Sequence, residues 1–406
     1  MTQPSASHVP LNRTLTLPMV TLYGLGVTVG AGIYVLVGQT AGIAGPFAPV
    51  SFILAAIVVG FTAFSYAELS TRMPVSAGAA AYVAAGLRKR WLAQTVGLAV
   101  AISGIISAAA VAIGAGQYLA DLTGLSADAM AVCVVLSMGA LAWWGITQSV
   151  ATAACITVIE IAGLIAVVLW ATTVSEPAGT GLSEMIPSLA GPHWAGIGAA
   201  SVLAFFAFVG FEDIVNIAEE SRDPRHVLPR AIVITLLITT LVYIAVVAAV
   251  LFAVPLQALA SSEAPLNLVF ADAPTWVQAT FSSIAVVATI NGVLIQIIMA
   301  SRVLYGMADR GQLPARLSYV SPRTRTPTVA TACVVIAILV LCQFVPIERL
   351  ASYTAQIVLA VFVAVNLALI SLKLRGDAAE GHFDIPLAMP VFGAVTSLAM
   401  LAVSFF

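Results

Sequence analysis

Long runs of apolar residues, separated by short polar connections, recur along the whole chain. An α-helix needs about 20 apolar residues to cross the hydrocarbon core of a bilayer, and runs close to this length occur eleven times. They lie near residues 17–43, 47–70, 91–120, 128–146, 150–174, 195–220, 229–254, 274–307, 328–346, 350–373 and 387–406. The pattern predicts an all-α polytopic membrane protein with about 11 transmembrane helices.

The composition excludes an ordinary soluble protein. Of the 406 residues, 61% are hydrophobic and only 8% are charged, whereas soluble domains contain about 25% charged residues. The same numbers exclude a disordered chain, which would be poor in apolar residues. The formal net charge of −2 gives no basic surface for nucleic acid. The expected partner is therefore the lipid bilayer.

The basic residues indicate an orientation. With the spans given above, every lysine and arginine except Arg349 falls on the side of the membrane that holds the N-terminus. Because cytoplasmic loops carry an excess of lysine and arginine, this side is expected to be cytoplasmic. We predict a multi-pass protein of the cell (plasma or inner) membrane with a cytoplasmic tail over residues 1–16.

Motifs for catalysis or metal binding are missing from the sequence. The four cysteines form no CxxC pair, the four histidines lie in tails or connections, and neither HExxH nor GxxxxGK[ST] occurs. We therefore expect no catalytic residues, no metal site, no cofactor and no enzyme activity.

The first span is unusually rich in glycine, which costs about 1 kcal/mol relative to alanine inside a helix. Its glycines are Gly24, Gly26, Gly30, Gly32 and Gly38. Two interpretations are open. The spacing of Gly26 and Gly30 could let two helices approach closely, or the glycines could interrupt the helix.

A second span favours the interruption. In the sixth span, Gly210 is followed by Glu212 and Asp213 within an otherwise apolar run. The first and sixth spans each open a group of five helices, so the second group enters the membrane from the opposite side. This is the arrangement of an inverted repeat whose paired broken helices form a substrate site at the midplane. The predicted units are 17–174 (helices 1–5), 195–375 (helices 6–10) and 387–406 (helix 11).

Two broken helices suit a zwitterion. Free N–H groups at Gly30, Ala31 and Gly32 would bind a carboxylate, and carbonyls released between Phe206 and Gly210 would bind an ammonium group. The predicted substrate is thus an α-amino acid. The predicted substrate-binding residues are Thr28, Gly30, Ala31, Gly32, Phe206, Val209 and Gly210.

Four motifs resemble those of the amino acid–polyamine–organocation (APC) superfamily of amino acid permeases. They are Gly30-Ala31-Gly32-Ile33-Tyr34, Phe208 to Glu212 with the following Glu219, Glu220, Pro224 and Pro229, the segment from Ser301 to Pro314, and Tyr66 to Leu69 with Pro74 and Gly78. The resemblance implies a LeuT-type five-plus-five inverted-repeat helical bundle, alternating access and small amino acids or amines as cargo. Members of the family usually have twelve helices, so helix 12 is expected to be absent here. It also implies an aromatic gate at Phe206, for which simple packing is the alternative.

Two carboxylates at membrane depth are candidates for coupling transport to protons. The resemblance implies that some uptake-type relatives carry a lysine at the position of Glu160. Glu212 follows Gly210, the glycine of the sixth span. For Glu160 the alternative is a structural hydrogen bond between helices. For Glu212 it is a brace that accepts backbone N–H bonds of the broken helix. Glu68 and Arg72 are spaced for an ion pair.

The predicted function is a secondary active transporter that imports a neutral amino acid together with a proton. The sequence leaves open an exchanger of amino acids or amines, and a membrane sensor without flux. The expected assembly is a monomer or a homodimer.

Overall fold

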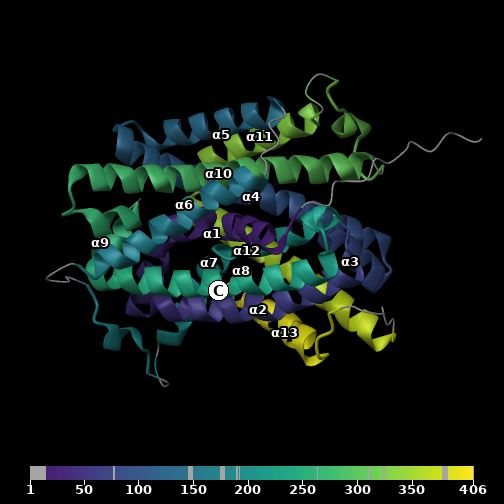
Figure 1. Cartoon of the computed structure of the whole chain (residues 1–406), viewed down its shortest axis with the longest axis horizontal. Helices are drawn as coiled ribbons and strands as arrows, with labels where there is room; N and C mark the ends of the chain where they lie inside the picture. The colour runs from purple at the N-terminus through teal and green to yellow at the C-terminus, as the bar shows by residue number, and fades with distance from the viewer. Residues whose placement is uncertain are drawn as a thin grey trace, which may run out of the picture.

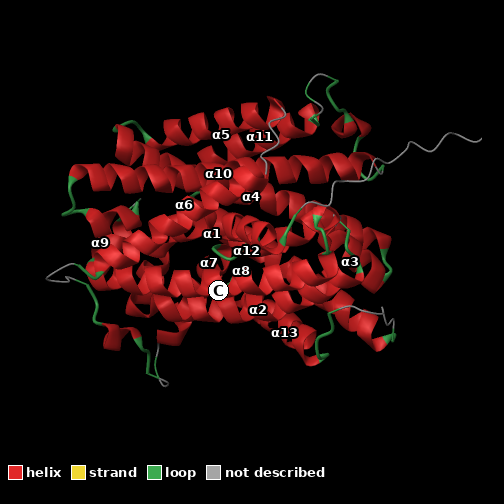
Figure 2. Ribbon diagram, viewed as in Figure 1, coloured by secondary structure: helices red, strands yellow, loops and turns green. Residues whose placement is uncertain are grey.

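The chain forms a bundle of α-helices joined by short turns in the computed structural model (Figures 1 and 2). The structure describes residues 15–75, 78–144, 150–173, 179–188, 191, 193–262, 264–309, 311–322, 324, 326–376 and 383–405. Within these residues no strand is present, and a single parallel bridge joins Leu15 to Ser221.

The predicted spans correspond in order to helices of the described chain. These are α1 (Leu17–Ala44), α2 (Ala48–Arg72), α4 (Arg90–Thr123), α5 (Ala127–Trp144), α6 (Val150–Ala171), α7 (His193–Phe206) continued by η3 (Phe211–Glu220), α8 (Pro224–Ala253), α10 (Thr275–Asp309), α11 (Thr328–Phe344), α12 (Ile347–Leu374) and α13 (Ala388–Val403). Short helical segments occupy the connections: η1 (Gly45–Phe47), α3 (Gly78–Leu87), η2 (Leu182–Met185), α9 (Leu256–Ser261), η4 (Pro265–Phe270) and η5 (Ala315–Ser318). Seven stretches of described residues are long and apolar enough to cross a membrane, and shorter apolar helices accompany them. The predicted all-α membrane architecture is confirmed.

Helix α1 lies in the middle of the bundle, where it packs against α4, α6, α7, α8 and α10 (Figure 1). Helices α5 and α11 form one edge, outside α4 and α10. Helix α13 forms the opposite edge, against α2 and α12. Helix α1, which carries four of the seven predicted substrate-binding residues, is therefore surrounded by other helices.

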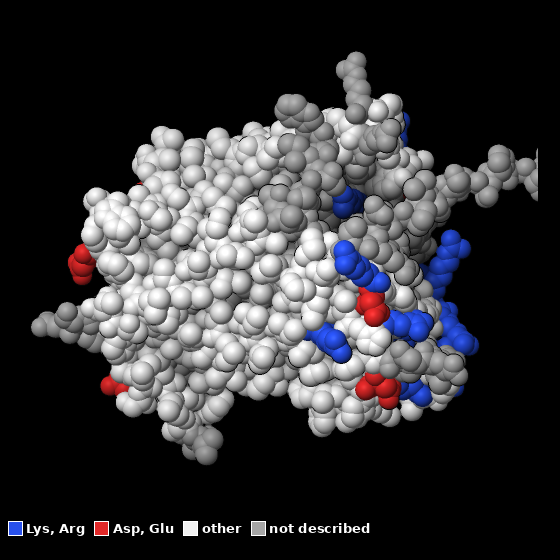
Figure 3. Space-filling model, viewed as in Figure 1, with Lys and Arg blue, Asp and Glu red and all other residues white. Residues whose placement is uncertain are grey.

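The surface in Figure 3 matches a bilayer-spanning bundle. Its broad middle carries no charged side chain, and the Lys and Arg side chains gather at the end of the bundle where α3 lies. Large apolar side chains such as Leu237 and Leu241 on α8 are exposed on the outside. Such a surface is unstable in water and fits the hydrocarbon of a membrane.

The predicted interruption of the first helix is not seen, because α1 runs without a gap from Leu17 to Ala44. Its glycines instead permit close packing, the alternative that the sequence left open. A Cβ added at Gly26 would collide with the Thr157 side chain of α6, and one at Gly38 would collide with the Leu259 carbonyl of α9. The helical hydrogen bonds of α1 outweigh the small propensity loss at each glycine.

A buried charge cluster ties three segments together at the basic end. Glu68 of α2 is fully buried, and its Oε1 accepts hydrogen bonds from Arg72 Nε and Nη2 at 2.8 and 2.7 Å. Its Oε2 lies 2.8 Å from Lys373 Nζ of α12 and accepts the Ile385 N–H at 3.0 Å. Asp384, which is mostly exposed, lies 2.6 Å from Lys373 Nζ. The predicted Glu68–Arg72 pair is confirmed, and two further charges join it.

Candidate functional site

The sixth span breaks where the sequence predicted. Helix α7 ends at Phe206, and tight turns follow in which Ala207, Phe208 and Val209 donate N–H bonds to carbonyls three residues earlier. Gly210 then adopts φ +123°, a region that side chains other than glycine rarely occupy. The chain resumes as the 3₁₀ helix η3. The predicted interruption of this helix is confirmed.

Glu212 braces the break. The backbone N–H of Gly210 donates a hydrogen bond of 2.9 Å to Glu212 Oε2. This contact satisfies a backbone donor that the interrupted helix leaves without a helical acceptor. The bracing role that the sequence left open for Glu212 is therefore observed in the described structure. Its predicted role in proton coupling stays a prediction.

Helix α1 packs directly onto the break through two glycines. A Cβ added at Gly32 would lie 2.8 Å from Cβ of Ala207, and one at Gly210 would lie 2.8 Å from Val27 Cγ1. Non-bonded carbon atoms do not approach one another this closely, so a residue with a Cβ does not fit at either position. The backbones of α1 and of the break therefore touch at these two glycines. The glycines of the predicted site thus allow backbone groups of α1 and of the break to lie side by side.

A tyrosine that the sequence reasoning missed joins the same two backbones. Tyr243 of α8 is fully buried. Its hydroxyl lies 2.7 Å from the Thr28 carbonyl of α1 and 2.8 Å from the Ala207 carbonyl in the break. A phenol has one proton, so it can donate to only one carbonyl at a time. Two carbonyls therefore converge on a single donor, and one of them has acceptor capacity to spare.

Glu160 lies close to this junction. It is fully buried on α6, and neither carboxyl oxygen has a hydrogen-bond partner of normal geometry among the described residues. Asn291 of α10 lies beside its carboxyl group. The Tyr34 hydroxyl donates to the backbone carbonyl of Glu160 at 3.0 Å. This bond ties the predicted coupling residue to α1, the helix that carries most of the predicted substrate residues.

Phe206 is the last residue of α7, directly before the break. It is buried and lines a small cavity with Val35 of α1, Val111 of α4 and Ile347 of α12. Four helices thus meet around one ring, as expected of either a gate or a packing residue. Val209, by contrast, is only partly buried.

The structure brings most of the predicted residues together, but it does not show the predicted release of backbone N–H groups in the first helix. The backbone of Gly30 and Ala31 belongs to α1, and their surroundings lie outside the described residues. Because α1 is continuous, the N–H groups of this segment are engaged in helical bonds and not released for a carboxylate. The predicted break that would release these N–H groups is not seen in α1, and the assignment of Gly30, Ala31 and Gly32 to the substrate site stays a prediction. The only sequence signal for Tyr243 was a single phenol inside an apolar span.

A bundle of apolar helices built around one broken helix, with buried carboxylates beside the break, defines a membrane transporter of the permease class. The chain belongs to the amino acid permease family, whose model matches residues 15–406. This confirms the APC superfamily resemblance, and the helix order agrees with the LeuT-type fold.

Similar proteins include bacterial and plant transporters. The chain is 28% identical over 413 residues to the branched-chain amino acid permease BcaP of Bacillus subtilis, covering 96% of this chain and 87% of that protein. It is 30% identical over 393 residues to the uncharacterized transporter Rv1999c of Mycobacterium tuberculosis, with the same coverage. It is 29% identical over 390 residues to the mitochondrial cationic amino acid transporter 3 of Arabidopsis thaliana, covering 90% of this chain and 63% of that protein.

Proposed function

We propose that this protein imports a neutral amino acid across the cytoplasmic membrane by alternating access, coupled to protons. The observation that carries the proposal is the convergence of the Thr28 and Ala207 carbonyls on the single Tyr243 hydroxyl. The carbonyl that lacks the phenol proton can accept a hydrogen bond from the α-ammonium group of a substrate. The proposed substrate-binding set remains Thr28, Gly30, Ala31, Gly32, Phe206, Val209 and Gly210.

A neutral side chain fits the surroundings best. The side chains nearest the break, such as Phe206, Phe208, Val27 and Val209, are apolar, and they favour an apolar substrate group. The name of the Bacillus relative, a branched-chain amino acid permease, supports the same choice. We propose a cytoplasmic N-terminus, because the described chain begins beside a basic connection: the Leu15 carbonyl accepts the backbone N–H of Arg222. We also propose that units 17–174 and 195–375 are the two repeats that alternate.

Glu160 is the proposed proton carrier. Burying an ionised carboxylate without a cationic partner is costly, and the described structure places no lysine or arginine against Glu160. A proton removes this charge. Protonation and deprotonation of Glu160 would therefore change the charge next to α1, to which α6 is joined by the hydrogen bond from the Tyr34 hydroxyl to the Glu160 carbonyl.

Uptake into proteoliposomes tests the coupling. With labelled leucine outside, an acidic outer solution should raise accumulation, and sodium should have no effect. Glu160→Gln should abolish gradient-driven accumulation while retaining leucine binding, because the amide keeps the shape but carries no exchangeable charge. Glu184→Gln, in an exposed connection, is the matched control and should behave as the unmodified protein.

Two results would contradict the coupling. Sodium-dependent uptake that ignores pH removes protons as the coupling ion. Normal accumulation by Glu160→Gln removes this residue from the mechanism. Efflux of labelled leucine that requires amino acid on the opposite side identifies an exchanger in place of a symporter.

A further inference from the structure

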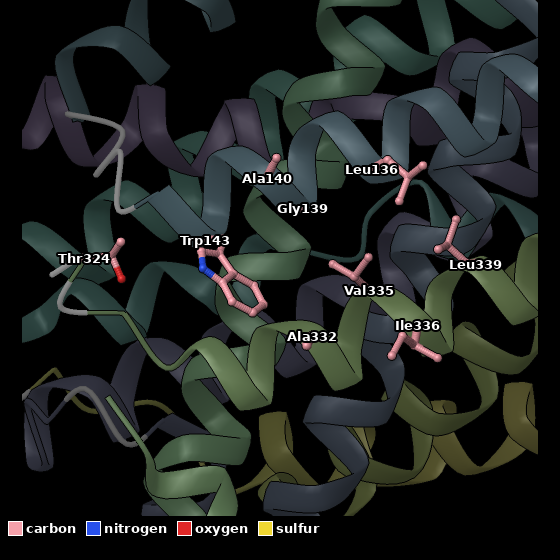
Figure 4. A pocket seen from close by; sticks show the side chains of 9 residues that line it. All are labelled: Leu136, Gly139, Ala140, Trp143, Thr324, Ala332, Val335, Ile336 and Leu339. Carbon is pink, nitrogen blue, oxygen red and sulfur yellow. The ribbon is translucent and has the colours of Figure 1, made fainter. Parts of the chain in front are cut away.

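The two proposed repeats, units 17–174 and 195–375, meet in different ways at different places in the bundle. Helix α5 of the first unit and α11 of the second line an open apolar groove of about 610 Å³ (Figure 4). Most of its lining side chains, such as Leu136 and Ile336, are aliphatic. Because attraction between aliphatic surfaces has no preferred direction, contacts of this kind do not hold the two units in one position.

Charges join the two units at the basic end of the bundle. Lys373, in the last turn of α12 in the second unit, places its Nζ 2.8 Å from Glu68 Oε2 on α2 of the first unit. Arg375, directly after α12, donates from Nη2 to the carbonyls of Ala85 and Gly86 at the end of α3. Two cations at the end of one helix are thus bonded to two helices of the other unit.

A short segment beyond the second unit completes this cluster. Residues 383–385, which we call the strap, form no helix or strand. The backbone N–H groups of Phe383 and Ile385 donate to Thr71 Oγ1 at 3.1 Å and to Glu68 Oε2 at 3.0 Å, both on α2. Lys373 Nζ donates to the Ile385 carbonyl at 2.7 Å. The strap is therefore bonded to both units at once.

A second polar contact between α2 and α12 lies deeper in the bundle. The Asn366 amide donates to Thr62 Oγ1 at 2.9 Å and accepts from Ser65 Oγ at 2.6 Å, and all three side chains are fully buried. Asn366 precedes Lys373 by two helical turns, or about 10 Å along α12. Breaking this contact would leave buried polar groups unpaired, which is costly. Charged groups at the end of the bundle can instead exchange their partners for water at a small net cost.

We propose that Lys373, Arg375 and the strap form a latch that closes the basic end of the bundle. The latch rests on the proposed function, in which the two units alternate. It holds α12 against α2 and α3 while the transport site is closed to the basic end. It separates when the site opens there, with Asn366 as the pivot of α12, and water then replaces the partners of Glu68.

Cross-linking α2 to the strap tests the latch. Arg72 Nη2 lies 3.9 Å from Asp384 Oδ1, so a short reducible thiol cross-linker should join the double variant Arg72→Cys, Asp384→Cys. The linked protein should lose leucine uptake into proteoliposomes at least about tenfold, because the basic end stays closed, and reduction should restore uptake. Leucine binding should be retained. Wild-type protein treated with the reagent controls for the native cysteines.

A second pair guards against misfolding of the first. If the double variant does not fold, Thr71→Cys with Phe383→Cys places the linker at the other contact between α2 and the strap, where Thr71 Oγ1 accepts the Phe383 N–H. The same loss of uptake and the same recovery on reduction are expected.

Amide hydrogen exchange reads the latch without substrate. The N–H groups of Phe383 and Ile385 are bonded to α2, so they exchange with solvent when the latch opens. Cross-linking should slow their exchange at least about tenfold. Exchange in α11, which lies outside the latch, should not change.

Two results would overturn the latch. Unchanged leucine uptake by the linked protein would show that α12 stays closed against α2 throughout transport. Strap exchange that is equally fast with and without the linker would show that these contacts do not open as a unit. Absence of leucine uptake by untreated wild-type protein would contradict the proposed function, and the hydrogen exchange would then decide on the latch alone.

Discussion

Replacing Tyr243 with phenylalanine removes one oxygen atom from the point where α1, α8 and the broken helix meet. The lost hydroxyl lies 2.7 Å from the Thr28 carbonyl and 2.8 Å from the Ala207 carbonyl. No water from outside can replace it without a rearrangement, because Tyr243 is fully buried. The substitution therefore leaves both carbonyls without this donor.

The magnitude follows from the hydrogen bond that is lost. A typical intramolecular hydrogen bond contributes about 1 kcal/mol, and a buried polar group left unsatisfied costs about 1–3 kcal/mol. Because the phenol serves one carbonyl at a time, the free energy of unfolding should fall by about 2 kcal/mol. If the same contact aligns the carbonyls for the substrate, a loss of about 1.4 kcal/mol in binding weakens the affinity about tenfold.

Tyr118→Phe is the matched control. Tyr118 of α4 is also fully buried. Its hydroxyl donates to the Tyr34 carbonyl of α1, the helix that also carries Thr28, at 2.6 Å. This variant should lose comparable stability, but its substrate affinity should stay within about twofold of the unmodified protein. Equilibrium binding of labelled leucine and the apparent melting temperature in detergent provide both readouts.

Two results would refute the reasoning. Wild-type affinity in a folded Tyr243→Phe protein would show that the phenol does not align the site. Equal affinity losses in Tyr243→Phe and Tyr118→Phe would show that the effect is general destabilisation.

Two further substitutions test the break and the charge cluster. Gly210→Ala should abolish leucine uptake, because Gly210 has φ +123° and the new Cβ would collide with Val27. Gly124→Ala is the control: Gly124 has φ +72° but no atom nearby, so this variant should lose only about 1 kcal/mol of stability and keep its uptake. Equal effects of the two variants on uptake would contradict this reasoning. Glu68→Gln should reduce stability by about 3 kcal/mol, because it removes the fully buried carboxylate that Arg72 and Lys373 both contact. Asp384→Asn, whose side chain is 65% exposed, should change stability by less than about 1 kcal/mol. Similar melting temperatures of the two variants would show that the buried carboxylate contributes little.

The charge cluster shows how far local spacing reaches. The Glu68–Arg72 pair could be predicted because residues four apart share one face of a helix. Lys373 and Asp384 lie some three hundred residues away, and no local rule links them to Glu68. Only the packing of α12 against α2 places the lysine beside the carboxylate.

The two glycine-bearing helices teach the same lesson in opposite directions. At Gly210 the sequence correctly predicted a break, since a glycine beside two acidic residues is costly in the middle of an apolar helix. At Gly30 and Gly32 the same kind of signal predicted a break that the backbone of α1 does not have. Glycine permits both an interruption and a close contact, and the neighbouring helix decides between them.

The sequence by itself determined the helices and the class of the protein. Span length and the scarcity of charge are local properties, and the bilayer requires every backbone group to be bonded within its own helix. The tertiary structure alone decided which polar groups meet, such as Tyr243 with two distant carbonyls and Glu68 with Lys373. These contacts join residues far apart in the chain, and they depend on where side chains of packed helices come within about 3 Å of one another.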